Sequence, residues 1–289
     1  MSLLAQPTPP QAPTAEAVMA RAQGESFPVA LRLLGRDVRA HLLAVYGFAR
    51  LVDELGDSVA GDRLAALDWL ESELDAAIEG RAEHPLLQAL TPTIAACALS
   101  REPFARLIEA NRLDQRKHGY ETWSELREYC SLSADPVGEI VLAVFGQSTP
   151  QRIALSDSIC TALQLAEHCQ DVAEDLRAGR VYLPREDMRR FGCEPEQLSA
   201  PVAGEPLRAT IAFEVTRARE LLREGLPLVG QLRGRARIAV AGFAGGGRAA
   251  LEAIERAGFD VLGGAPRASG TRRLAAVLAT LAQADRANR

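Results

Sequence analysis

The amino-acid sequence predicts an all-α fold, on the grounds of composition, periodicity and the positions of helix-breaking residues. Of the 289 residues, 47% are hydrophobic and 5% are aromatic. The apolar residues are mostly Ala and Leu with Glu and Arg between them, which is typical of packed helices rather than of sheets. Gly and Pro separate the periodic stretches. The chain is long and apolar enough to bury a substantial core.

The helical stretches follow one another along the chain with turn residues between them. Apolar side chains at helical spacing predict helices at about 38–57, 62–79, 86–97, 102–117, 122–146, 151–177, 206–229 and 247–257, and a further helix is expected from Gly270. The segment 185–205 holds Pro195, Pro201 and Gly204 and predicts a loop. A domain boundary there would leave only a thin C-terminal piece. We therefore expect a flexible tail over residues 1–17 and one domain over residues 18–289.

Composition excludes several classes of function. The formal net charge of -5 argues against nucleic acid as a partner. The five cysteines are widely spaced without a Cys-x-x-Cys pair, so neither a disulfide framework nor a zinc site is predicted. The tail lacks the pattern of a signal peptide, and no stretch reaches the roughly 20 apolar residues of a membrane span. The sequence predicts a cytoplasmic protein, with at most peripheral contact at the inner face of the membrane.

The first of two acidic motifs interrupts the predicted helix over 38–57. Tyr46, Arg50, Asp53 and Asp57 follow at spacings of four, three and four, so they share one helix face. Two neighbouring carboxylates repel each other, and a hard cation such as Mg²⁺ between them removes that repulsion. The alternative is an ordinary solvated face on which Arg50 makes a surface ion pair.

The second motif lies in the predicted helix over 151–177. Gln164, Glu167, Asp171 and Asp175 form another acidic stripe, which a turn ending at Arg180 closes. A solvated face again explains one such stripe. Two such stripes on mostly apolar helices instead favour a common function for both.

If the two stripes face each other, their four aspartates can hold two or three Mg²⁺ ions, and these ions can hold a diphosphate. Arg50 and Arg180 would neutralise the remaining phosphate oxygens, a role that suits the guanidinium fork. Such a cluster suits the ionisation of an allylic diphosphate, because Mg²⁺ stabilises the charge that develops on the leaving group. An apolar cavity walled by helices would protect the resulting cation from water.

These residues carry a family resemblance. With the tracts over 25–57, 129–138 and 163–184, the chain resembles the squalene/phytoene synthase family over most of residues 22–260. Within that family, the Phe-Pro-Val-Ala stretch from Phe27 and the Ser-Ala-Asp-Pro-Val-Gly stretch ending at Gly138 are similar to the bacterial hydroxysqualene synthase branch of hopanoid and squalene biosynthesis.

The resemblance implies a single-domain isoprenoid synthase, a helical bundle around a central apolar cavity, that releases diphosphate. By position, it implies Mg²⁺ ligands at Asp53, Asp57, Asp171 and Asp175, and catalytic diphosphate contacts at Tyr46 and Arg50. It implies substrate contacts at Phe27, Arg50, Tyr129, Val137, Gly138, Gln164, Glu167, Arg180 and Tyr182. Tyr182 and Asp135 serve either substrate contact or structure. For Gly138, inside a predicted helix, the alternatives are close helix packing and a kink that widens the cavity.

Two positions depart from the commonest family pattern. Glu167 stands where the family usually has Asn, and Gln170 stands where it usually has Arg. Losing an Arg and gaining a carboxylate makes the net charge beside the predicted diphosphate less positive. These changes favour an enzyme that receives presqualene diphosphate already made, ionises it and captures the rearranged cation with water to give hydroxysqualene. Contact with neighbouring enzymes of such a pathway is expected.

No NADPH is expected. The glycine-rich stretch over 237–247 lacks the Gly-x-Gly-x-x-Gly order and a βαβ context, and it predicts a turn between tightly packed helices. His168 is expected to serve packing, since it is turned away from its acidic neighbour on the helix and His is a poor Mg²⁺ ligand.

Two alternatives stay open. One is a head-to-head synthase that uses farnesyl diphosphate or a longer homologue to make presqualene diphosphate, squalene, dehydrosqualene or phytoene. The other is a non-catalytic helical relative that acts in binding or assembly.

Overall fold

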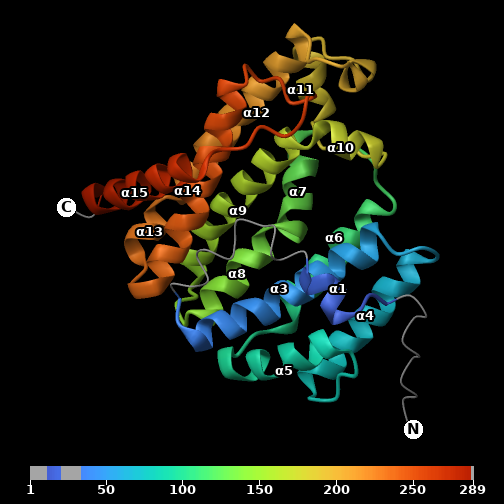
Figure 1. Ribbon diagram of the computed structural model, residues 1–289, viewed down its shortest axis with the longest axis vertical. Coiled ribbons are helices and arrows are strands. Elements are labelled where there is room, and N and C mark those ends of the chain that lie inside the picture. The colour runs from blue at the N-terminus through green and yellow to red at the C-terminus, as the bar shows by residue number, and fades with distance from the viewer. Residues whose placement is uncertain (1–11, 21–33, 288–289) are drawn as a thin grey trace. The chain divides into compact units, whose positions relative to one another are not determined.

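The computed structural model describes residues 12–20 and 34–287, and the regular structure in these ranges is helical (Figure 1). Apart from one isolated bridge between Gly119 and Val181, no strand pairing occurs in the described ranges. The all-α prediction is therefore confirmed. The chain divides into two compact units: unit 1 holds residues 1–116 and 139–148, and unit 2 holds residues 117–138 and 149–289.

Unit 1 is built around α3 (Arg36–Asp57), which confirms the helix predicted over 38–57. It packs against α1 (Ala15–Ala20), α4 (Arg63–Ile78), α5 (Pro85–Cys97) and α6 (Arg101–Asp114). The buried face of α3 carries Phe48, whose ring meets that of Phe104 edge to face with centroids 5.0 Å apart. Burial of apolar side chains along this face, rather than helix propensity alone, stabilises the helix. Helix α1 begins inside the segment predicted to be a tail.

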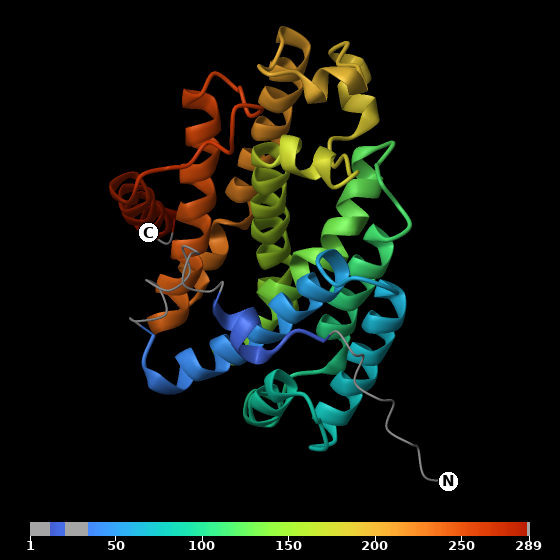
Figure 2. The same ribbon diagram turned by 45° about the vertical axis from the view of Figure 1, so that its right-hand side comes forward.

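Unit 2 centres on α9 (Pro150–Gln170) and α12 (Glu205–Gly225), which run antiparallel and lie side by side (Figure 2). The unit also contains α7 (Trp123–Ser133), α10 (Val172–Arg177), α11 (Arg185–Arg190), the 3₁₀ helix η2 (Pro195–Ser199), α13 (Pro227–Gln231), α14 (Gly234–Arg256) and α15 (Gly270–Ala287). The predicted loop over 185–205 thus holds two short helices, and the sequence analysis missed both. Their few turns carry too little periodicity to be recognised.

Close packing explains two glycines of α14, Gly245 and Gly247, and corrects the turn predicted over 237–247. Those residues lie inside α14, which begins at Gly234 rather than near residue 247. A Cβ added at Gly245 would lie 2.7 Å from the Val277 Cα of α15, and one at Gly247 would lie 2.3 Å from the Leu163 side chain of α9. The small residues are needed for tight packing, as predicted, but between whole helices rather than at a turn.

Three predicted helices are interrupted where the sequence analysis expected continuity. The helix over 122–146 breaks at Ala134 into α7 and α8 (Asp135–Val144). Pro136 explains the break, because its ring lacks an N–H and clashes with the preceding turn of a helix. The helix over 151–177 breaks at Asp171. The helix over 206–229 likewise ends at Gly225, two residues before Pro227.

Candidate functional site

Helix α3 presents the first acidic motif on one continuous helix. Arg50 donates from Nη1 to Oδ2 of Asp53 at 3.3 Å, and half of the Asp53 side chain is exposed. Asp57 is the last residue of α3 and is exposed. Both carboxylates lie near the C-terminal end of α3, which is the negative end of the helix dipole. The last turn of α3 contains no basic residue that would offset this charge. A bound cation would relieve this unfavourable arrangement.

The second acidic motif lies across the break between α9 and α10. Asp171 leaves helical geometry, with φ -105° and ψ 15°. The backbone hydrogen bonds nevertheless continue through it: Asp171 N–H donates to Glu167 O at 2.9 Å, and Asp175 N–H donates to Asp171 O at 2.8 Å. The spacing that places the Asp171 and Asp175 side chains together therefore survives the break.

Burial raises the pKa values of both aspartates in this second motif, and neighbouring carboxylates add to the rise. Burial, reinforced by the Asp171 carboxylate, raises the pKa of Asp175 to about 7, and Arg180 partly opposes the rise. Burial and the nearby Glu174 also raise the pKa of Asp171. Half-buried carboxylates that resist ionisation are stabilised by a cation between them. The donor set of this motif therefore fits Mg²⁺, which prefers oxygen ligands.

A tight turn places Arg180 beside this motif. Gly179 adopts φ 79° after the end of α10, and its N–H donates to Leu176 O at 2.9 Å. Arg180 N–H donates to Asp175 O at 2.8 Å, which completes a Schellman motif. Glycine adopts this left-handed conformation without strain. The Arg-Ala-Gly-Arg sequence therefore determines the turn that places the Arg180 backbone beside Asp175.

Three tyrosines of unit 2, Tyr120, Tyr129 and Tyr182, form one aromatic cluster. The rings of Tyr129 and Tyr182 have centroids 5.4 Å apart, and their hydroxyl oxygens are 3.5 Å apart. Tyr120, which the sequence analysis did not single out, stacks on Tyr182 with centroids 5.9 Å apart. The strand-like pairing of Gly119 with Val181 brings the two segments together.

His168 lies at the centre of the aromatic cluster. Its ring stacks on that of Tyr182 with centroids 3.9 Å apart and an angle of 13°. Burial, with a smaller contribution from Arg180, lowers the pKa of His168 to about 3, so the imidazole is neutral at pH 7. Its Nε2 lies 3.3 Å from Nε2 of Gln164, close enough for the amide N–H to donate to a neutral imidazole.

The structure thus brings together Gln164, Tyr129, Tyr182 and Arg180 around His168 within unit 2. His168 packs, as the sequence analysis expected, but it also connects residues predicted to contact substrate. The available signal was a histidine four residues after Gln164 and three residues before Asp171, which places the three on one helix face.

Other predicted contacts have different surroundings. Phe27 lies outside the described residues. Val137 is exposed on α8. A Cβ at Gly138 would lie 2.2 Å from Ser156 Oγ and 2.6 Å from Cys160 Sγ, so this glycine permits close packing of α8 on α9. Of the two explanations weighed for Gly138, helix packing is the one that the geometry supports.

Asp135 has a buried structural environment. Its Oδ2 accepts from Arg127 Nη1 at 2.8 Å, and its Oδ1 accepts from Thr161 Oγ1 at 2.9 Å. Of the two roles open for Asp135, these bonds support the structural one, which connects the start of α8 with α7 and α9. Gln170 also contacts protein, because its side-chain amide donates to the carbonyl of Pro266.

A second buried ionic cluster in unit 2 escaped sequence reasoning. Arg217 Nη1 lies 2.8 Å from Asp187 Oδ2 and 2.6 Å from Glu214 Oε1, and both acids are buried. The guanidinium also covers the Trp123 ring at 4.6 Å. This cluster connects α11 and α12 with the start of α7. Glu214 and Arg217 are neighbours on α12, but Asp187 and Trp123 lie far from them in the sequence, so no local pattern indicated the whole cluster.

Within the described ranges, no three His, Cys, Asp or Glu side chains are grouped as a ready-made metal site. The two acidic motifs belong to different units, and each unit contains one aspartate pair. None of the helices in the described ranges is long and apolar enough to cross a membrane.

Comparison with known proteins gives the family. The sequence profile described as squalene/phytoene synthase matches residues 20–274. The chain belongs to the squalene/phytoene synthase family. The predicted resemblance is confirmed.

Relatives in this family differ in their named products. A hydroxysqualene synthase of Sinorhizobium fredii is 35% identical over 72% of this chain and 72% of its own length. A 15-cis-phytoene synthase of Synechococcus elongatus is 31% identical over 82% of each chain. The crystal structure of squalene synthase HpnC from Alicyclobacillus acidocaldarius has 47% sequence identity and a TM-score of 0.79, and the match covers 85% of this chain and 93% of that one.

Proposed function

We propose that this member of the family is a hydroxysqualene synthase that acts on presqualene diphosphate. The observation that carries the proposal is the order of similarity, because a hydroxysqualene synthase is 35% identical to this chain and a phytoene synthase 31%. The departures at Glu167 and Gln170 support the same choice, since an added carboxylate and a lost Arg together make the net charge of the second acidic motif less positive.

The reaction has a simple balance. The C–O bond of presqualene diphosphate breaks and its electron pair leaves with the diphosphate. The cyclopropylcarbinyl cation rearranges, water adds to it, and the bound water loses one proton to give hydroxysqualene. No reductant is consumed, so no NADPH is required.

The aspartate pairs would hold Mg²⁺, with Asp53 and Asp57 on α3, Asp171 just before α10 and Asp175 within it. The ions, when bound, stabilise the negative charge on the leaving diphosphate. Two observations support the fit: the raised pKa values of Asp171 and Asp175, and the acidic C-terminal end of α3. Arg50 and Arg180 would each bind phosphate oxygens with a guanidinium fork.

The aromatic cluster would act on the hydrocarbon part of the substrate. A phenol ring presents a negative π face, which stabilises a nearby cation. Tyr129 and Tyr182 supply two such rings, and neutral His168 keeps Tyr182 stacked and Gln164 held in place. Since His168 carries no charge at pH 7, it does not repel a cation.

One assay tests the proposal. Purified protein is incubated with presqualene diphosphate and Mg²⁺, and the extract is examined for hydroxysqualene and released diphosphate. Both products are expected, and neither should form when EDTA replaces Mg²⁺. Absence of hydroxysqualene under these conditions would sink the proposal.

The head-to-head synthase remains the second candidate, because a phytoene synthase is nearly as similar to this chain. Parallel incubations with farnesyl and geranylgeranyl diphosphate, with and without NADPH, separate the two. Formation of presqualene diphosphate, squalene, dehydrosqualene or phytoene from these substrates would favour the second candidate. Failure to bind diphosphate with Mg²⁺ would instead favour a non-catalytic relative.

A further inference from the structure

Ser133, the last residue of α7, carries a buried hydroxyl group. Within residues 12–20 and 34–287, this oxygen has no hydrogen-bond partner. A hydroxyl in a helix often donates to the carbonyl four residues back, as Thr280 does to Ala276 O at 2.9 Å. Ser133 makes no such bond. Because a buried hydroxyl is unfavourable without a partner, this group is suited to bind a small polar molecule.

Contacts on either side of Ser133 determine where it lies along α9. Before it, the centroids of the Tyr129 and His168 rings are 6.2 Å apart. After it, Asp135 Oδ1 accepts from Thr161 Oγ1 at 2.9 Å. Residue numbers on α9 fall as those on α7 rise, so the two segments run antiparallel. Ser133 therefore lies between these two contacts, one helical turn after Tyr129 on the same face of α7.

Gln164 lies on α9 between the same two contacts, and its amide group can act together with the Ser133 hydroxyl. The amide nitrogen of Gln164 lies 3.3 Å from His168 Nε2 and donates to the neutral imidazole. This bond uses the nitrogen and leaves the amide oxygen as an acceptor. A water molecule that accepts from Ser133 and donates to Gln164 has one lone pair left for a reaction.

We propose that the Ser133 hydroxyl binds and orients the water molecule that captures the rearranged cation. The inference rests on the proposed function, and it assigns a residue to the step that defines the product. Ser133 lies one turn from Tyr129, whose ring is proposed to stabilise that cation. As water adds, its lone pair forms the new C–O bond, and one proton passes to the released diphosphate. Ser133 is neither consumed nor charged in this step.

Orientation of this water decides between two products. A cation that meets no water loses a proton from a neighbouring carbon and becomes the alkene dehydrosqualene. Capture requires a water oxygen close to the cationic carbon when the charge arrives there, and a hydrogen-bonded water is in place before the reaction. The Ser133 hydroxyl thus acts after the C–O bond of the substrate has broken. Its loss changes the product and leaves the release of diphosphate almost unaffected.

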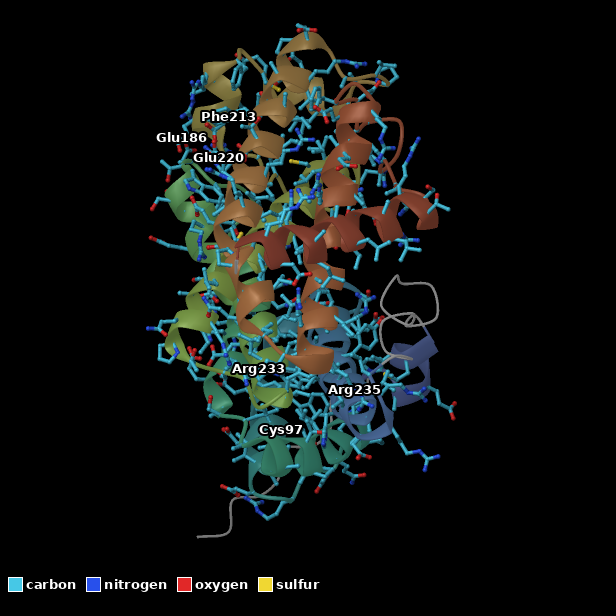
Figure 3. The ribbon with its side chains drawn as sticks, turned by 90° about the vertical axis from the view of Figure 1, so that its left-hand side faces the viewer. Cys97, Glu186, Phe213, Glu220, Arg233 and Arg235 are labelled. Atoms are coloured by element: carbon cyan, nitrogen blue, oxygen red, sulfur yellow. The ribbon has the colours of Figure 1, made fainter. Side chains whose placement is uncertain are left out.

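Contacts at the start of α7 hold the helix that carries Ser133. Trp123 N–H donates to Oε1 of Glu186, a residue labelled in the upper part of Figure 3, at 2.6 Å. The guanidinium of Arg217 covers the Trp123 ring at 4.6 Å. These contacts connect α7 with α11 and α12 far from Ser133. We therefore expect substitutions confined to the Ser133 side chain to leave the helix in place.

Product analysis of three variants tests the inference. Ser133→Thr keeps a hydroxyl, Ser133→Val has the shape of threonine without the hydroxyl, and Ser133→Ala removes the hydroxyl without adding volume. Each protein is incubated with presqualene diphosphate and Mg²⁺, and diphosphate, hydroxysqualene and dehydrosqualene are measured.

The three variants have different expected products. Ser133→Ala and Ser133→Val should lower the ratio of hydroxysqualene to dehydrosqualene about tenfold, as loss of one hydrogen bond does. Their rate of diphosphate release should stay within about twofold of the unchanged protein, because ionisation precedes capture. Ser133→Thr should keep most of the original ratio.

A matched control lies on the same helix. Ser131→Ala also removes a hydroxyl from α7, one that donates to Glu128 O at 2.6 Å. This variant should give the product ratio of the unchanged protein. Circular dichroism and thermal melting of every variant confirm that each is folded.

The results that contradict the inference differ from those that contradict the proposed function. If the unchanged protein forms hydroxysqualene but Ser133→Ala and Ser133→Val give the same product ratio, the inference alone is overturned. An equal fall of the ratio in Ser131→Ala, or a loss of diphosphate release in Ser133→Thr as large as in Ser133→Val, would restrict Ser133 to a structural role. Absence of hydroxysqualene from the unchanged protein would overturn the inference and the proposed function together.

Discussion

The two aspartate motifs share a sequence pattern but differ in structure. On α3 the pair lies on a continuous helix, with Asp53 half exposed and Asp57 exposed at the helix end. At the α9–α10 break the pair is less exposed; burial raises the pKa values of both aspartates, and the Asp171 carboxylate further raises that of Asp175. An identical four-residue spacing therefore creates one pair near an exposed helix end and one half-buried pair that resists ionisation. We infer that the second pair gains more from a bound cation.

The largest expected effect is on turnover. Asp171→Ala and Asp175→Ala should each reduce hydroxysqualene formation by about a hundredfold to a thousandfold, as loss of one electrostatic contact to developing charge commonly does. Asp53→Ala should abolish turnover as well. The matched control is Glu174→Ala, which removes an exposed carboxylate from the same short helix. Full activity of Asp53→Ala with loss in Asp171→Ala would show that only the second pair serves the reaction, and full activity of all of these variants would make both pairs solvated faces.

The next effect concerns the packing that positions α9, the helix that carries the second motif. Gly138→Ala should lower the free energy of unfolding by about 1–3 kcal/mol, because its Cβ would overlap Ser156 Oγ. Gly242→Ala in α14 is the control, since nothing lies within 4 Å of its Cβ, and it should raise stability by about 0.5–1 kcal/mol. Urea unfolding measures both. Equal stability of the two variants would contradict the close α8–α9 contact.

A smaller effect tests the half-buried second motif by pH in the metal-free protein. The folded pKa of Asp175 is raised to about 7 from 3.8, so its ionisation weakens the folded state progressively as pH rises from about 4 to about 7. Asp175→Asn should therefore raise the free energy of unfolding at pH 8 by about 1–2 kcal/mol, after allowance for solvent screening, and by little at pH 4. Thermal unfolding of Asp175→Asn and of the unchanged protein at the two pH values is the measurement, and an equal difference in stability at pH 4 and pH 8 would contradict the raised pKa of Asp175.

The smallest effect tests the link between the second motif and the aromatic cluster. His168→Phe keeps an aromatic ring against Tyr182 but removes the contact with Gln164. We expect a melting temperature within a few degrees of the unchanged protein and a several-fold loss in kcat, worth about 1 kcal/mol. His168→Gln, which can still accept a hydrogen bond, should recover part of the rate. An unchanged kcat for His168→Phe would restrict His168 to packing.

Local sequence signals predicted most helix starts, because caps act within a few residues. The Asp62 carboxylate accepts from Ala65 N–H at 3.0 Å at the start of α4, and the Thr122 hydroxyl accepts from Glu125 N–H at 3.2 Å at the start of α7. The turn at Gly179 was also predicted from a local signal, the Arg-Ala-Gly-Arg sequence. Where a neighbouring helix decides, local signals failed: the glycines of α14 were interpreted as a turn because only Val277 and Leu163, distant in sequence, require small residues there.

The sequence by itself determined the all-α class, the family and the two acidic stripes, because composition, helical period and four-residue spacing are local properties that survive without knowledge of the fold. Only the tertiary structure decided how those stripes behave. The pKa of Asp175 depends on burial and on which charges surround it, and the place of His168 depends on Tyr182, which reaches it through the pairing of 181 with 119. Burial, close approach and contact with side chains distant in the sequence are properties of packed helices, and no single stretch of sequence determines them.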